Sequence, residues 1–170
     1  MDAMECILTR RSVRQYTNEK IDEETVRQLL EAAMSAPTAC NQQPWEFVVV
    51  DDPALLAKAK DVNAHAAMAA RAPLAVLVCA DTTRELKCPG FWIQDCSAAI
   101  ENLLLAARAL GLGGVWTAAY PREDRVEGYR DLFGLPEHIV PVALLVIGHP
   151  AQEQHRLDRY DAARVHRNAW

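Results

Sequence analysis

The stretch Arg10-Arg11-Ser12-Val13-Arg14 places three guanidinium groups and one hydroxyl within five residues. In an extended segment, residues 10, 12 and 14 project to the same side, because side chains alternate along the backbone. Arg10 and Arg14 could then bind a phosphate through paired N–H groups, while Ser12 hydrogen-bonds a neighbouring hydroxyl. The alternative is a solvated helix end, where cations also complement the helix dipole. The motif alone leaves both interpretations open.

A second polar stretch, residues 35–45, reads Ser-Ala-Pro-Thr-Ala-Cys-Asn-Gln-Gln-Pro-Trp. The side-chain amides of Asn41, Gln42 and Gln43 carry both donors and acceptors, which recognition of a heteroaromatic ring edge requires. Two prolines would restrict the backbone on either side of them. A plain turn between a helix and a strand is the alternative, and this motif alone does not exclude it.

Familiar protein-borne catalysts are absent from the sequence, which contains no GxSxG, HExxH or P-loop motif. The five histidines share no metal-ligand spacing. Residues 111–114 are glycine-rich, but they lack the GxGxxG pattern and follow a predicted helix rather than a strand. We therefore expect no metal site and no catalytic side chain, and infer that a cofactor would supply the chemistry of an enzyme with this sequence.

Hydrophobic periodicity and capping residues predict the elements that must position these motifs. Asp2 and Glu5 resemble a capping box for a short helix whose Met4, Ile7 and Leu8 face inward. Two further helices are predicted to begin at Asp22 and just after Asp52, and two more to cover about 92–110 and 122–132. The predicted strands cover 45–50, 73–80, 113–120 and 140–148. Helices and strands mixed without regular βαβ alternation predict an α+β fold.

The composition indicates one soluble domain. With 170 residues, 51% of them hydrophobic, the chain is long enough for a single packed domain, which we expect to span residues 1–170. No apolar run reaches the roughly 20 residues of a membrane helix, and the acidic N-terminus is unlike a secretory signal. We expect a cytoplasmic protein with no membrane partner.

The net charge of −5 argues against general nucleic-acid binding, which requires a basic face. The charge is unevenly distributed: residues 1–14 and 155–170 together carry a net +3, which leaves −8 for the rest of the chain. A small anion held by both chain ends would explain this distribution. Two solvated termini would explain it equally well.

The five cysteines are an odd number without a CxxC spacing, so we predict neither a disulfide framework nor a zinc site. Cys79 and Cys96 have apolar neighbours and are expected to pack as small hydrophobic side chains. Cys40, within the amide-rich stretch, could be a redox thiol, although a packed thiol is the favoured interpretation. Reduced thiols are typical of a cytoplasmic protein.

Taken together and in this order, four segments resemble the FMN-dependent nitroreductase family. They are Arg10–Arg14, the stretch Ala36–Phe47, the predicted helix from Trp92 through Ala107, and the turn Leu110–Gly113. The polar tail that ends in Trp170 also looks like the C-terminus of that family. The similarity spans essentially the whole chain.

The resemblance implies a nitroreductase-like three-layer fold, in which helices flank a central, mostly antiparallel sheet. It also implies a homodimer with FMN in the interface and a C-terminal tail that extends onto the partner. Such a tail would explain why the 22 residues from His149 are too polar to form a core of their own. The helix at 92–110 would gain an apolar partner across the two-fold axis.

By position within the family motifs, the resemblance implies phosphate contacts for Arg10 and Arg14 and a ribityl contact for Ser12. The best match for a further phosphate contact in the tail is Arg159, with Arg156 as the alternative. Some relatives carry a second tail cation two residues before that arginine, where this chain has leucine.

Around the flavin ring, the resemblance implies that Asn41 supplies an amide, with Gln43 nearby, and that Pro37 and Thr38 approach from the other subunit. The backbone N–H groups of residues 117–119 would face flavin N5, although some relatives have Glu-Gly where this chain has Ala118-Ala119. The full set of implied FMN-binding residues is Arg10, Arg11, Ser12, Arg14, Pro37, Thr38, Asn41, Gln43, Thr117, Ala118, Ala119 and Arg159.

The activity that the resemblance implies is an NAD(P)H-dependent FMN oxidoreductase. Hydride would pass from NADH or NADPH to flavin N5, and then to an electron-poor small molecule such as a nitroaromatic or a quinone, in ping-pong order. A non-catalytic flavin-binding or storage protein is an alternative, as is a reductive dehalogenase or a flavin-cleaving enzyme. All of these would share the phosphate motif, so the motif cannot separate them.

Overall fold

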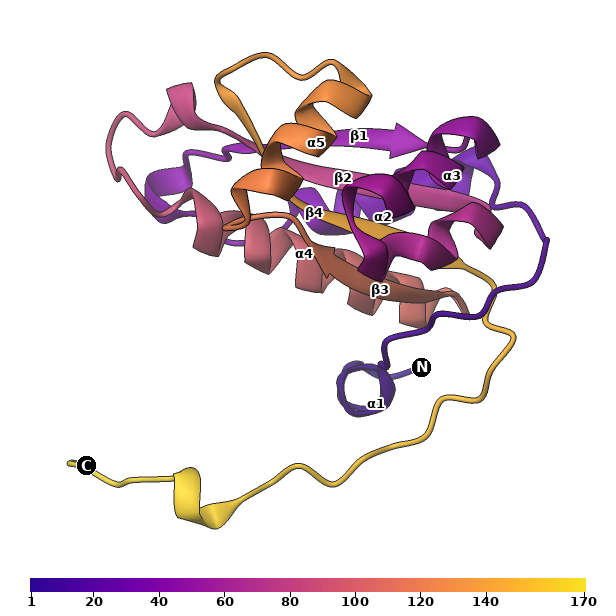
Figure 1. Ribbon diagram of the computed structural model, residues 1–170. Helices are drawn as coiled ribbons and strands as arrows, with labels where there is room; N and C mark the ends of the chain where they lie inside the picture. Colours follow the sequence, from indigo (N-terminus) through magenta and orange to yellow (C-terminus); the bar gives the residue numbers. More distant parts are fainter.

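The computed structural model describes residues 1–170 and contains a four-stranded antiparallel sheet with helices on both faces (Figure 1). The strands are β1 (Trp45–Val50), β2 (Leu74–Asp81), β3 (Gly113–Ala118) and β4 (Ile139–Gly148), in the spatial order β1-β2-β4-β3. The central strands β2 and β4 are buried at nearly every position, as their continuous apolar sequences predict. The predicted α+β class and the antiparallel sheet are confirmed.

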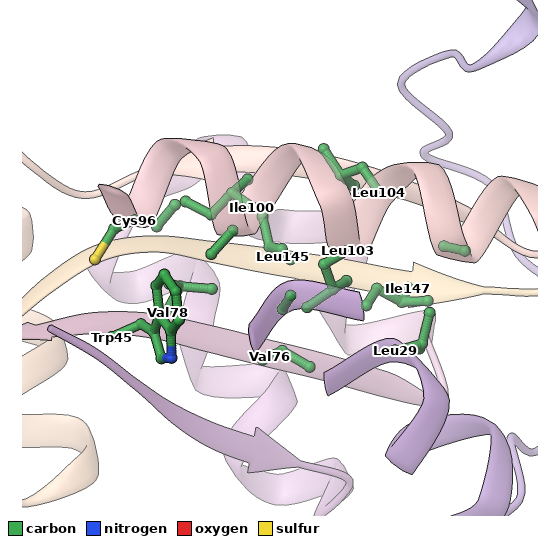
Figure 2. Close-up of a cluster of buried hydrophobic side chains, with 14 of the residues drawn as sticks. Leu29, Trp45, Val76, Val78, Cys96, Ile100, Leu103, Leu104, Leu145 and Ile147 are labelled. Carbon is green, nitrogen blue, oxygen red and sulfur yellow. The ribbon is translucent and has the colours of Figure 1, made fainter. Parts of the chain in front are cut away.

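On one face of the sheet, α2 (Glu23–Met34) and α4 (Trp92–Ala109) form the larger hydrophobic core. Figure 2 shows Ile100, Leu103 and Leu104 of α4 packed against the strands, with Leu29 of α2 beside them. These side chains recur at helical spacing, so each helix presents one apolar stripe to the sheet. The predicted start of α2 and the predicted bounds of α4 each agree with the structure to within one residue.

The opposite face is covered by α3 (Pro53–Val62), the 3₁₀ segment η2 (Ala64–Arg71) and α5 (Glu123–Phe133). Asp52 caps α3 by accepting a 2.7 Å hydrogen bond from the Ala54 N–H, which confirms the predicted start of that helix. Tyr129 of α5 is fully buried in this second core. The sheet is therefore covered by a hydrophobic core on each face.

The N-terminal helix α1 (Ala3–Thr9) begins as predicted, because the Asp2 carboxylate accepts a 3.0 Å hydrogen bond from the Glu5 N–H. The prediction that Met4 and Ile7 face inward is wrong: their exposed fractions are 62% and 49%. The buried residue of α1 is Cys6, whose thiol donates to the Leu105 carbonyl of α4 at 3.1 Å. Met4 and Ile7 therefore leave much of their surface exposed, whereas Leu8 is half-buried.

Cys40 and Cys88 form a disulfide, with 6.5 Å between their Cα atoms. The prediction of no disulfide and of a packed Cys40 thiol is therefore wrong. The two residues are 48 positions apart, and the fold brings them together through two loops at the same end of the sheet, which neither cysteine count nor spacing could reveal. Cys79 and Cys96 are fully buried, as predicted.

The C-terminal tail leaves the sheet after β4 and extends away from the body of the chain (Figure 1). Residues 155–170 are all exposed, and their single 3₁₀ turn is η4 (Ala162–Arg164). The tail contacts the body where the Arg11 Nε donates to the His155 carbonyl at 2.7 Å. No helix of the chain combines the length and the apolar character needed to cross a bilayer.

Candidate functional site

The arginine-rich segment after α1 is extended and runs alongside the edge strand β3. The Val13 N–H donates to the Gly114 carbonyl at 3.0 Å, and Ser12 forms a parallel bridge with Gly114. Val13 is fully buried, whereas Ser12 and Arg14 are exposed, so the side chains alternate as the sequence predicts. A Cβ on Gly113 would lie 2.5 Å from the Val13 Cγ2, and only glycine leaves room for this approach.

Positive charge accumulates around this segment with little compensation. Arg10 pairs with Glu101 through its Nε at 3.1 Å, while Arg14 has no acidic partner. Arg11 donates to the Leu8 carbonyl at 2.8 Å. Burial and the nearby charge of Arg159 lower the pKa of Arg11, which means that guanidinium groups repel one another here. An anion bound among them would relieve this repulsion.

A cavity of about 470 Å³ opens beside Arg14, on the outer side of β3. It is lined by Arg14, Ala64, His65, Met68, Val115, Trp116, Thr117, Ala118 and Arg125. Three residues that the sequence analysis assigned to a site, Arg14, Thr117 and Ala118, are therefore brought together. His65 and Arg125 were missed, because each lies in a helical segment that carries no motif.

The edge of β3 offers backbone groups to this cavity. In an antiparallel pair, alternate residues direct their peptide groups toward and away from the partner strand. The Gly114 carbonyl accepts on the outer edge, so Trp116 and Ala118 also face outward. By contrast, the Ala119 N–H donates to the Val142 carbonyl at 2.9 Å, and Thr117 pairs with Leu144 at an alternate position of the ladder, so its peptide groups face β4. Of residues 117–119, only Ala118 therefore has its N–H on the outer edge of β3, and Ala118 also lines the cavity.

Two side chains fix the carbonyl of Ala118. Asn63 donates to it through Nδ2 at 3.3 Å, and Arg125 donates through Nη1 at 2.9 Å. Asn63 is 2% exposed and also accepts a 3.0 Å hydrogen bond from the His65 N–H. Asn63 thus joins two walls of the cavity, the η2 segment and the end of β3.

The amide-rich loop lies at the N-terminal end of α4 and contains the 3₁₀ turn η1 (Ala39–Asn41). The buried Asp95 carboxylate of α4 accepts the Ala39 N–H at 3.0 Å. Gln43 donates through Nε2 to the Asn41 Oδ1 at 3.1 Å, and both side chains are exposed. Thr38 accepts the Gln43 N–H at 3.3 Å, which closes the loop.

The single chain does not bring all the predicted residues together. None of Pro37, Thr38, Asn41 and Gln43 lines the cavity beside Arg14, and neither does Arg159 in the exposed tail. The chain thus presents two separate groups: a cationic cavity with an open strand edge, and a loop of exposed amides. The first suits an anionic, planar ligand with hydrogen-bonding edges, and the second suits the edge of a heteroaromatic ring.

Comparison with known proteins gives a consistent family. The profile of the Nitroreductase family matches residues 7–93 and 60–149. The chain is 47% identical over 170 residues to a Methanothermobacter thermautotrophicus protein named "Putative NADH dehydrogenase/NAD(P)H nitroreductase", covering 100% of this chain and 88% of that protein.

Solved structures agree with that family. A structure with the same name from Bacteroides thetaiotaomicron superposes with a TM-score of 0.94 at 42% identity, covering 99% of this chain and 98% of that one. A structure described as an FMN-dependent nitroreductase, from Clostridium difficile, gives a TM-score of 0.91 at 27% identity, covering 98% of this chain and 99% of that one.

Proposed function

Because the chain belongs to the nitroreductase family, we propose that it is an NAD(P)H-dependent FMN oxidoreductase that reduces electron-poor small molecules such as nitroaromatics or quinones. The observation that supports this most is the cavity in which the unpaired Arg14 adjoins the open edge of β3. Residues 1–170 would act as a single FMN-binding domain in the cytoplasm.

The residues around the cavity fit FMN. Arg14, together with Arg10 and the tail Arg159, would hold the dianionic phosphate, and the exposed Ser12 would hydrogen-bond the ribityl chain. Arg11 would contribute charge, since its own hydrogen bonds go to backbone carbonyls. The outward N–H of Ala118 would donate to the ring, with the Ala118 peptide held by Asn63 and Arg125.

When bound, FMN supplies the redox chemistry, since its ring can accept hydride from NADH or NADPH and pass it to an acceptor. The protein would position the ring and stabilise negative charge on it. Arg125 and Arg14 both line the cavity, and fixed cations in a partly enclosed site stabilise developing anionic charge. No side chain is assigned as an acid or base. Nicotinamide and acceptor would occupy the same face in turn, which gives ping-pong order.

The site would be completed in a homodimer. The amide-rich loop, with Pro37, Thr38, Asn41 and Gln43, does not line the cavity of its own chain. The loop of one subunit would instead meet the cavity of its partner. An apolar groove of about 470 Å³ between α1 and α4, lined by Met1, Ile7 and Leu105 among others, supplies an apolar surface for that contact. The exposed tail would extend across the same interface.

Binding of FMN tests the proposal first. The purified protein should be yellow, or should take up added FMN at about one molecule per chain, and should sediment as a dimer. A colourless protein that takes up no FMN would contradict the proposed function and would equally contradict a role in flavin storage. A flavin-loaded monomer would contradict the shared site.

A further inference from the structure

The Cys40–Cys88 disulfide connects the amide-rich loop to the segment that precedes α4. We propose that Cys40 and Cys88 are a reversible dithiol–disulfide pair, which exchanges with low-molecular-weight disulfides and fixes the loop that carries Asn41 and Gln43. Their Cα separation of 6.5 Å lies within the range that disulfides span, about 4.4–6.8 Å. The pair is thus a modification site, and its effect on FMN rests on the function proposed above.

Gln42 holds the two loops together through hydrogen bonds to backbone groups, none of which involves a cysteine sulfur atom. Its Oε1 accepts the N–H groups of Lys87 and Cys88, both at 2.9 Å, and its Nε2 donates to the Cys88 carbonyl at 3.2 Å. These three hydrogen bonds can persist when the disulfide is reduced. Reduced thiols held side by side have a high effective concentration, which favours closure of the disulfide over a stable mixed disulfide.

The other three cysteines are protected from exchange. Cys79 and Cys96 are fully buried, and burial raises the pKa of each thiol to about 12. Cys6 is 6% exposed, and burial raises its pKa as well. The thiolate is the reactive form, so these residues are poor nucleophiles. In the single chain, Cys40 is exposed and Cys88 half-buried, which makes them the accessible pair.

The exchange needs a disulfide reagent as oxidant. One cysteine thiolate attacks a sulfur of the reagent, forms a mixed disulfide and releases one thiolate. The second cysteine attacks the mixed disulfide at the protein sulfur, closes the Cys40–Cys88 bond and releases the second thiolate. The cysteine pair loses two electrons and two protons, and the reagent gains both and becomes two thiols. An excess of external dithiol reverses the reaction.

The loop has a conformation that a cross-link would help to maintain. Cys40, Asn41 and Gln43 have φ values of 51°, 54° and 51°, in the left-handed region that residues other than glycine rarely adopt. Such a backbone persists only where its surroundings hold it. With the disulfide closed, Asn41 and Gln43 would be preorganised for the flavin edge. We expect reduction to weaken FMN binding by about three- to tenfold.

Thiol labelling tests the chemistry without FMN. After reduction, native protein treated with iodoacetamide should be modified rapidly at Cys40 and Cys88 only. Treatment of the reduced protein with oxidised glutathione should give one disulfide between the peptides that contain these residues. Cys40→Ser and Cys88→Ser should instead each retain one glutathione. Stable double glutathionylation of the wild type, or equal labelling of all five cysteines, would overturn the proposal.

Hydrogen exchange of the apo-protein tests the effect on the loop. Amides of residues 38–43 should exchange faster in reduced than in oxidised wild type, whereas a Cys40→Ser/Cys88→Ser double variant should not respond to reductant. Identical exchange in the two wild-type forms would overturn the fixing of the loop. FMN affinity that does not change on reduction would do the same. If neither the reduced nor the oxidised protein binds FMN, the proposed function is contradicted. Thiol labelling and hydrogen exchange would then still test whether Cys40 and Cys88 are a reversible pair.

Discussion

The Asn63 side chain donates a 3.3 Å hydrogen bond to the carbonyl of Ala118 and so links the start of η2 to the end of the edge strand β3. Asn63 is almost fully buried, and its Oδ1 also accepts from the His65 N–H. Both partners belong to segments that line the cationic cavity. The shape of that cavity therefore depends on a residue that is not part of its surface.

Replacing Asn63 by alanine should loosen this connection. The η2 segment loses the side-chain cap that accepts the His65 N–H, at a cost of about 0.5–2 kcal/mol of stability. FMN affinity should fall by about tenfold, because the Ala118 peptide is held less firmly. Thermal melting of the apo-protein and an FMN titration measure the two effects separately. Asn18→Ala, at an exposed position, is the matched control. Unchanged FMN affinity in a destabilised Asn63→Ala protein would show that Asn63 acts on folding alone.

Arg14 is expected to be the most sensitive of the phosphate residues, because it has no acidic partner and lines the cavity directly. A charge-assisted contact contributes about 1.5–3 kcal/mol, so Arg14→Ala should weaken FMN binding by about 10- to 150-fold, and Arg14→Glu should abolish it. Fluorescence titration with FMN measures this. Arg27→Ala removes an exposed guanidinium paired with Glu24 and Glu31 and should leave the affinity unchanged. An equal loss of FMN affinity in Arg14→Ala and Arg27→Ala would contradict the assignment of Arg14 as a phosphate-binding residue.

Gly113 should not tolerate a side chain, since an added Cβ would lie 2.5 Å from the Val13 Cγ2. Gly113→Ala should cost about 1–3 kcal/mol through overpacking, which corresponds to a melting temperature lower by about 3–10 °C. Combining it with Val13→Ala should recover part of the loss relative to the sum of the two single variants. Strictly additive effects in the double variant would contradict a direct contact between the two residues.

Asp22 should contribute a pH-dependent part of the stability. It caps α2, and hydrogen bonding from the Thr25 backbone lowers the pKa of the Asp22 carboxyl below its usual range. A carboxyl with a lowered folded-state pKa stabilises the protein above its unfolded pKa, about 3.9, and this contribution is lost as pH falls through the folded value. The melting temperature of apo Asp22→Asn should lie below that of wild type at pH near 6. The difference in melting temperature between the two proteins should disappear toward a pH of about 2. A difference that does not change with pH would contradict a stabilising role of the ionised Asp22 carboxylate.

Much of the fold follows from local sequence. The continuous apolar runs of β2 and β4 require burial on both faces, and Asp2, Asp22 and Asp52 begin their helices because each carboxylate accepts a backbone N–H. The alternation of residues 12–14 also follows, with Val13 inside and Ser12 and Arg14 outside. These features depend on residues close together in the chain.

The features that could not be predicted depend on contacts across the fold. The Cys40–Cys88 pair forms because two loops meet, and its members are 48 residues apart. His65 and Arg125 line the cavity from η2 and α5, which cover the face of the sheet opposite α2 and α4. The sequence predicts that Met4 faces the core of its own chain, but Met4 is exposed. Apolar residues at helical spacing show that one side of a helix is apolar, and they do not show which surface that side contacts.

Anaerobic reduction of the FMN-loaded protein tests the central claim most directly. Addition of NADH, and in a separate sample NADPH, should bleach the visible flavin absorbance with at least one of the two reductants. A nitroaromatic or a quinone added afterwards should restore it. A yellow protein whose absorbance neither reductant changes would contradict the proposed oxidoreductase and would favour a protein that binds flavin without turnover.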